Sequence, residues 1–205
     1  MIYRCFNYAH AGDVPKFLKK FKSQLQDNTQ VMHTFRELIL GAYLTGRGFN
    51  VRYEYTSDGE TPDWSALNES AVLIAIVELI NFHLDLATAD SIDAELLNRG
   101  YWIGWQTSND VRLYERIQHK MNAYKTLVKK HDIPYVVAVF GEFRAAVNRD
   151  ELNTCLYSSE YGLFELNREV SGVLFFEESS GRYQFTYMPN PNPLIRLDIP
   201  DGSFS

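Results

Sequence analysis

Cysteine is scarce in this 205-residue sequence: Cys5 and Cys155 are the only two, and they lie far apart. Their spacing excludes a disulfide framework and a cysteine-based zinc or redox motif, and it favours a reducing, cytoplasmic setting. Positive charge is not in excess either, since the formal net charge is −6. Electrostatic binding of nucleic acid over the whole protein surface is therefore not expected, although a basic groove on an otherwise acidic protein is compatible with this net charge.

Long apolar runs are also absent. No run approaches the roughly 20 residues of a membrane-spanning helix, and residues 1–6 lack the apolar core of a signal peptide. We therefore expect a soluble, cytoplasmic protein without a membrane partner. The sequence has no phosphate-binding loop, dinucleotide fingerprint or serine triad. What it does have is a hydrophobic content of 45%, which is enough for the core of one domain.

Apolar periodicity predicts an α/β fold. Residues recur at helical spacing in 13–25, 29–46, 85–99, about 109–131 and 149–157. Short β-branched or aromatic runs predict strands at 49–55, 71–80 and 133–140, and a hairpin of 172–176 with 182–187. Residues 100–105 fit either a strand or a packed loop, and residues 194–205 are expected to be irregular.

The predicted elements form one domain over residues 1–205, with a central mixed β-sheet flanked by helices. The helical crossover between strands 71–80 and 133–140 allows those strands to lie parallel.

A carboxylate lies within the apolar run 71–80. Burying the charge of Glu78 costs several kcal/mol unless a partner compensates it, and a metal ion shared with Asp63 is one candidate. Asp63 follows Pro62 at a turn, so turn formation is an alternative role for it. Glu37 lies beside the apolar stripe of helix 29–46 and would join them in one compact unit. Ion pairs are the alternative explanation for Glu37 and Glu78.

Together these segments resemble a known family. The order is a helix with Glu37, a turn at Gly46-Arg47-Gly48, a strand, Thr61-Pro62-Asp63-Trp64, a buried strand with Glu78, a helix with Lys120 and Tyr124, and a strand from Ile133. This order resembles the core of the PD-(D/E)xK nuclease superfamily, which has the restriction-endonuclease-like fold. The resemblance covers about residues 29–143, and residues 165–205 would be a C-terminal hairpin extension. It implies a metal-dependent endonuclease acting on DNA, with Asp63 and Glu78 as metal ligands and Glu37 as the acidic residue of the helix.

The sequence departs from the family pattern at the lysine. In the family a lysine follows the second acid by two residues and shares its face of the strand, but here Ile80 holds that position and Asn81 faces the other way. Lys120 is our candidate for a migrated catalytic lysine, because it lies on the inward row of its helix beside Ile117. A lysine that snorkels from a partly buried face is the alternative interpretation.

The reaction that the family resemblance implies indicates the remaining candidate site residues. Phosphodiester hydrolysis needs a cation, an activated water and charge relief at the transition state. Oxygen ligands favour Mg²⁺ or Mn²⁺, and the backbone carbonyl of Leu79 is a further candidate ligand. Gln118 and His83 are candidate substrate-binding residues, and His33, one turn before Glu37, could approach the site.

Three functions remain open at this point. The first is a DNA nuclease. The second is a catalytically inactive relative that uses the same fold to bind nucleic acid or protein, which the missing lysine and the acidic charge favour. The third is an assembly subunit, for example a homodimer, that uses the C-terminal hairpin and the aromatic segment 101–105 as its interface.

Overall fold

The computed structural model describes residues 1–82, 86–100, 110–141, 147, 149–158 and 160–204. Within them the chain forms eight helices: α1 (Ile2–Phe6), α2 (Val14–Gln24), α3 (Asn28–Gly46), α4 (Leu86–Arg99), α5 (Asp110–Ala123), α6 (Lys125–His131), α7 (Arg149–Tyr157) and α8 (Leu163–Leu166). It also forms seven strands: β1 (Val51–Tyr53), β2 (Trp64–Leu67), β3 (Leu73–Phe82), β4 (Tyr135–Gly141), β5 (Gly172–Ser179), β6 (Arg182–Pro189) and β7 (Gly202–Phe204). No helix among these residues is long and apolar enough to cross a membrane.

The seven strands make one mixed sheet in the order of the sequence, β1 to β7. Neighbouring strands are antiparallel except at the centre, where β4 is parallel to both β3 and β5. The parallel pairing predicted for strands 71–80 and 133–140 is therefore confirmed as the pairing of β3 with β4, in which Glu78 lies opposite Val137. The predicted C-terminal hairpin is also confirmed, as β5 and β6.

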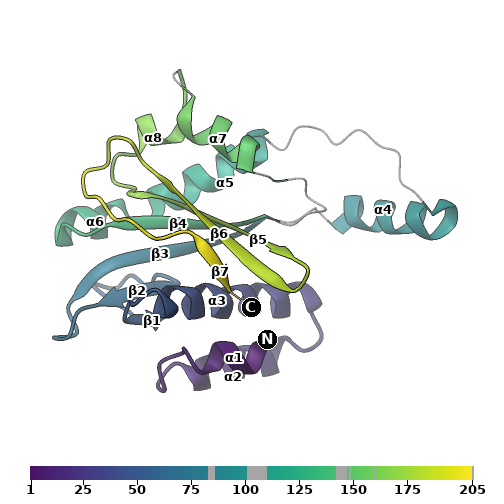
Figure 1. Ribbon diagram of the computed structural model, residues 1–205, viewed down its shortest axis with the longest axis horizontal. Helices are drawn as coiled ribbons and strands as arrows, with labels where there is room; N and C mark the ends of the chain where they lie inside the picture. Colours follow the sequence, from purple (N-terminus) through teal and green to yellow (C-terminus); the bar gives the residue numbers. More distant parts are fainter. Residues whose placement is uncertain (83–85, 101–109, 142–146, 148, 159, 205) are drawn as a thin grey trace.

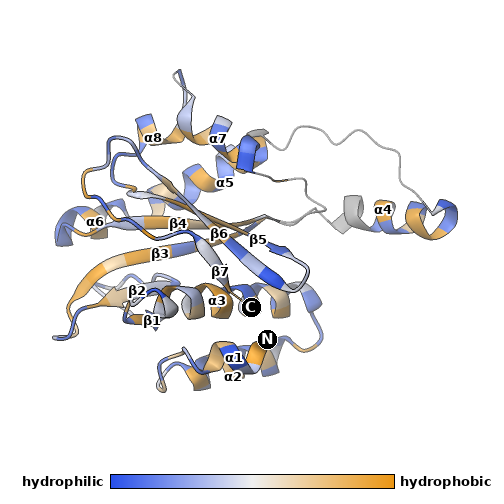
Figure 2. Ribbon diagram, viewed as in Figure 1, coloured by the Kyte–Doolittle hydropathy of each residue, from blue (hydrophilic) through white to orange (hydrophobic). Residues whose placement is uncertain are grey.

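Helices cover both faces of this sheet. Figure 1 shows α1, α2 and α3 on one side and α5 to α8 on the other, with α4 set apart from the body. The most apolar strands in Figure 2 are β3 and β4, which lie between the two helical layers. Alternate residues of β3 face opposite layers, so that Val77 and Leu79 pack toward α3 and Ile76 and Ile80 toward α5. By the same alternation, Glu78 faces α5.

Three sequence predictions need correction. Strand β2 was not predicted, because its four residues are all buried and show no alternation. Residues 194–205 are not irregular throughout, since β7 pairs with β6. The helix expected over about 109–131 is broken at Tyr124 into α5 and α6. At the break, the carbonyl of Lys120, which would accept the Tyr124 N–H in a continuous helix, accepts the hydroxyl of Tyr135 at 2.5 Å. Residues 101–105 lie outside the described residues.

Close packing of α3 on β2 depends on a glycine. The Trp64 ring lies over Gly41, where a Cβ atom would come within 2.0 Å of it, and the Trp64 indole N–H donates to the carbonyl of Glu37 at 3.0 Å. We expect Gly41→Ala to lower the free energy of unfolding by about 1–3 kcal/mol or more, measured by urea denaturation. Gly46→Ala is the control, because a Cβ there meets only Tyr8 at 3.7 Å. Equal stability of the two variants would show that this contact does not constrain α3.

The N-terminal layer is tied to the sheet edge through Asp13, whose side chain is fully buried. Its carboxylate accepts from Arg52 Nε at 2.9 Å and from the Tyr53 N–H at 3.0 Å. Burial alone would raise the pKa of Asp13, but these bonds and the charges of Arg52 and Lys16 outweigh it, so the pKa is lowered from 3.8. A lowered carboxyl pKa stabilises the fold above the unfolded pKa, and this contribution is lost as the pH falls through the folded pKa.

Asp13→Asn should therefore cost about 1–3 kcal/mol of unfolding free energy at pH 7 and less at about pH 3, because below the unfolded pKa of 3.8 the contribution of the ionised carboxylate is being lost. Urea denaturation at both pH values measures the difference. The exposed Asp198 supplies the control Asp198→Asn, for which little change is expected at either pH. A cost for Asp13→Asn that is the same at both pH values contradicts the ionised pair.

Candidate active site

The candidate site lies where β3 extends beyond β2. Pairing of the two strands ends at Trp64 opposite Val77, so the next residues of β3 are beyond the reach of β2. A cleft of about 690 Å³ opens at this edge, between α2 and α3 on one side and α5 on the other. Its lining includes Lys20, His33, Glu37, Asp63, Arg116 and Lys120.

Two carboxylates extend the strand pairing beyond the end of β2. Glu78 Oε1 accepts the backbone N–H of Asp63 at 2.7 Å, and Asp63 Oδ2 accepts the backbone N–H of Leu79 at 2.8 Å. Each acid thus binds the backbone at or beside the other acid. The turn that carries Asp63 is held against β3, and the predicted proximity of Asp63 and Glu78 is present in the fold.

Lys120 reaches this pair from α5. Its ammonium lies 2.5 Å from Glu78 Oε2 and 4.0 Å from Asp63 Oδ2. The side chain of Glu78 is only 2% exposed, against 24% for Asp63 and 31% for Lys120. The partner that a buried Glu78 requires is therefore Lys120 in this structure.

Burial and like charge control the protonation of the pair. Burial first, and then the charge of Asp63, raise the pKa of Glu78 to about 7 despite the opposing effect of Lys120. Burial lowers the pKa of Lys120, but the charges of Glu78 and Asp63 outweigh it, so that the net shift is upward. Lys120 is therefore a cation at neutral pH, and its charge faces the cleft.

Glu37 lies on another wall of the same cleft, within a second ionic cluster. Its Oε2 accepts the hydroxyl of Tyr53 at 2.5 Å and the ammonium of Lys20 at 3.2 Å. Lys20 also pairs with Glu54 at 2.9 Å. Burial, the largest effect, raises the pKa of Glu37 against the charge of Lys20. Glu37 thus shares the cleft with Asp63 but is paired separately from it.

A divalent cation has a partial set of ligands here. Asp63 and Glu78 offer carboxylate oxygens, and the carbonyl of Leu79 lies at the same strand edge as its N–H, which faces Asp63. In the described part of the chain, no three His, Cys, Asp or Glu side chains gather closely enough to hold a metal. The two carboxylates and the carbonyl fit Mg²⁺ or Mn²⁺ with water completing the shell, as Mg²⁺ usually keeps several waters.

The other sequence candidates have different outcomes. His33 lines the cleft. The Gln118 amide is paired reciprocally with Asn167 at 3.2 and 3.3 Å, and it is not brought to the carboxylates. His83 lies outside the described residues.

The cleft residues that the sequence did not reveal include the basic side chains of Lys20, Arg116 and His119. Arg116 could have been found, because it is one turn before Lys120 on the same helix face. The position of Lys20 depends on how α2 packs against α3, for which the sequence gives no local signal.

The Lys120–Glu78 pair makes a direct prediction about stability. Lys120→Met leaves a buried carboxylate without its cation and should cost about 1–3 kcal/mol of unfolding free energy, less than a fully buried pair because Lys120 is partly exposed. In a double-mutant cycle with Glu78→Gln, urea denaturation should give a coupling of about 0.5–3 kcal/mol. Lys130→Met, which removes an exposed pair with Asp58, is the control and should leave stability nearly unchanged. Additive costs for the first two variants would contradict the pairing.

Comparison of the chain with protein-family models, curated proteins and solved structures found no match.

Proposed function

We propose that this chain is a divalent-metal-dependent nuclease that hydrolyses phosphodiester bonds in DNA. The observation that carries the proposal is the convergence of Lys120 on Asp63, with which it lines the cleft, and on the buried Glu78 beside them. The family pattern places a lysine where this chain has Ile80, and an ammonium arriving from α5 replaces that charge at the carboxylates. A lysine that merely snorkelled to solvent would not touch a carboxylate that is 2% exposed.

The order of elements around the cleft supports the same proposal. Helix α3 carries Glu37 and leads into β1, the turn with Asp63 leads into β2, and β3 carries Glu78. Helix α5 then carries Lys120, and β4 returns parallel to β3. This is the order in which the restriction-endonuclease-like core is expected to present its site, and we propose that fold for residues 29–143.

Each residue has a separate role in the proposed reaction. Asp63, Glu78 and the Leu79 carbonyl would hold Mg²⁺ or Mn²⁺, which supplies a Lewis acid and lowers the pKa of a bound water. Lys120 donates to the attacking water or to a phosphoryl oxygen and offsets the negative charge that develops at phosphorus. Glu37, kept in place by Tyr53 and Lys20, adds a carboxylate on the substrate side of the cleft.

One observation favours a catalytically inactive binding module as the second candidate. Both oxygens of Glu78 already have partners, the Asp63 N–H and the Lys120 ammonium. The ion pair therefore accounts for the buried carboxylate without a metal. This alternative expects nucleic-acid or protein binding without turnover, and binding that survives Asp63→Ala.

Cleavage of plasmid and single-stranded DNA in Mg²⁺ or Mn²⁺ separates the two candidates. We expect wild type to cleave and EDTA to abolish cleavage. Asp63→Ala, Glu78→Gln and Lys120→Met should each lose about 10²–10³-fold in rate, because each removes a ligand or a charge that acts at the transition state.

Two exposed residues outside the cleft supply matched controls, Glu177→Gln on β5 and Lys22→Met on α2, and both should keep wild-type rates. Thermal unfolding of every variant, with and without metal, separates loss of the site from loss of the fold. If wild type and Asp63→Ala are equally inert with both metals on both substrates, the catalytic proposal fails and the binding module takes its place.

A further inference from the structure

Arg116 is a cation of the cleft whose charge is not neutralised by any residue that the structure describes. Its guanidinium lies at the cleft and donates from Nη1 to the backbone carbonyl of Asn81 at 3.2 Å. Among the residues that the structure describes, no carboxylate forms an ion pair with it. By contrast, Lys20 and Lys120 of the same cleft are each paired with a glutamate at 3.2 Å or less. Glu115 also lines the cleft, but consecutive helix residues do not face each other.

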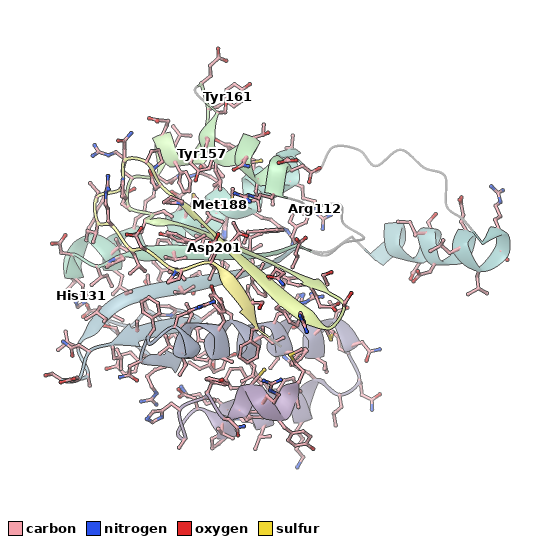
Figure 3. The ribbon with its side chains drawn as sticks, viewed as in Figure 1. Arg112, His131, Tyr157, Tyr161, Met188 and Asp201 are labelled. Carbon is pink, nitrogen blue, oxygen red and sulfur yellow. The ribbon has the colours of Figure 1, made fainter. Side chains whose placement is uncertain are left out.

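A second arginine lies beside Arg116 on the same helix. Arg112 lies one turn before Arg116 on α5, and both guanidinium groups lie over the Phe82 ring, at 4.9 and 5.5 Å from its centroid. Figure 3 shows Arg112 at the end of α5 that faces α4. Burial and the charge of Arg112 both lower the pKa of Arg116. Two like charges held against one ring are stabilised by any anion that binds between them and the cleft.

The spacing along α5 relates this charge to the carboxylate site. Residues four apart lie on one face of a helix, and each such step advances about 6 Å along its axis. Arg116 is therefore one step from Lys120, and Arg112 is one step further. Neighbouring phosphates of one nucleic-acid strand have a comparable separation. A guanidinium also matches the oxygens of a phosphate better than an ammonium does.

Resting on the proposed nuclease function, we infer that Arg116 binds the phosphate next to the scissile one, which would lie at Lys120 and the carboxylates, on a single nucleic-acid strand lying along α5. The size of the cleft selects a single strand. Its volume of about 690 Å³ is typical of pockets for small ligands, roughly 300–1,000 Å³, and the Glu78 side chain, only 2% exposed, lies behind the lining residues Asp63 and Lys120. A segment of a flexible strand can follow such a space more readily than a duplex, which is stiff over this length.

Binding without turnover tests this subsite. Fluorescence anisotropy of a labelled oligothymidylate in EDTA, over a series of salt concentrations, measures affinity and the number of phosphates neutralised. Arg116→Gln should weaken binding about tenfold and reduce the slope of log affinity against log salt by about 0.7, the loss of one phosphate contact on a single strand. Arg116→Lys should keep most of the slope, which also guards against a misfolded glutamine variant.

The control is Arg182→Gln, which removes an exposed arginine of β6 and should leave affinity and slope unchanged. A duplex of the same length should bind at least about tenfold more weakly than the single strand. Equal binding by the two glutamine variants, or tighter binding of the duplex, overturns the inference. Because EDTA prevents metal-dependent cleavage, failure of the nuclease proposal appears separately, as an Arg116-dependent affinity without turnover once Mg²⁺ is added.

Discussion

The buried carboxylate of Glu78 is the constraint on which the rest of this structure depends. One of its oxygens takes the N–H of Asp63 and the other takes the ammonium of Lys120. The first bond holds the turn before β2 against β3 at the point where strand pairing stops. The second brings α5 to the sheet at the same level. Without both partners a charge in the middle of a central strand would be costly, so one residue fixes the turn, the strand edge and the helix together.

Charge balance in the cleft follows from this arrangement. Lys20 with Glu37 on one wall and Lys120 with Glu78 at the strand edge form two separate ionic clusters, and each places a cation beside a buried carboxylate. Such pairs contribute little net stability, because desolvation offsets their attraction, so stability alone does not explain why the cleft has two. They leave the cleft preorganised, with cations and carboxylates already fixed relative to one another. This is the condition under which charged groups act most strongly on a substrate.

The sequence predicted the parts of this fold that depend on local pattern. Periodicity identified α2, α3, β3, β4 and the hairpin, and the presence of a charge in an apolar run indicated that Glu78 needs a partner. Helical spacing placed Lys120 on an inward face, and the structure pairs it with Glu78. What the sequence could not predict depends on tertiary contact. Strand β2 is too short for a periodic signal, and Lys20 reaches Glu37 only because α2 packs beside α3.

The break between α5 and α6 shows how a displaced lysine can be held accurately. A lysine on β3 would be oriented by the sheet itself, whereas a lysine on a helix moves whenever that helix moves. Here the hydroxyl of Tyr135 on β4 binds the carbonyl of Lys120, and the hydroxyl of Tyr124 binds the carbonyl of Thr61 at 3.2 Å. The contact at the break thus ties the backbone of Lys120 to the central strand, and Tyr124 ties the break to the turn before β2 that carries Asp63. The irregularity that the sequence pattern did not predict is therefore what fixes the ammonium relative to both carboxylates.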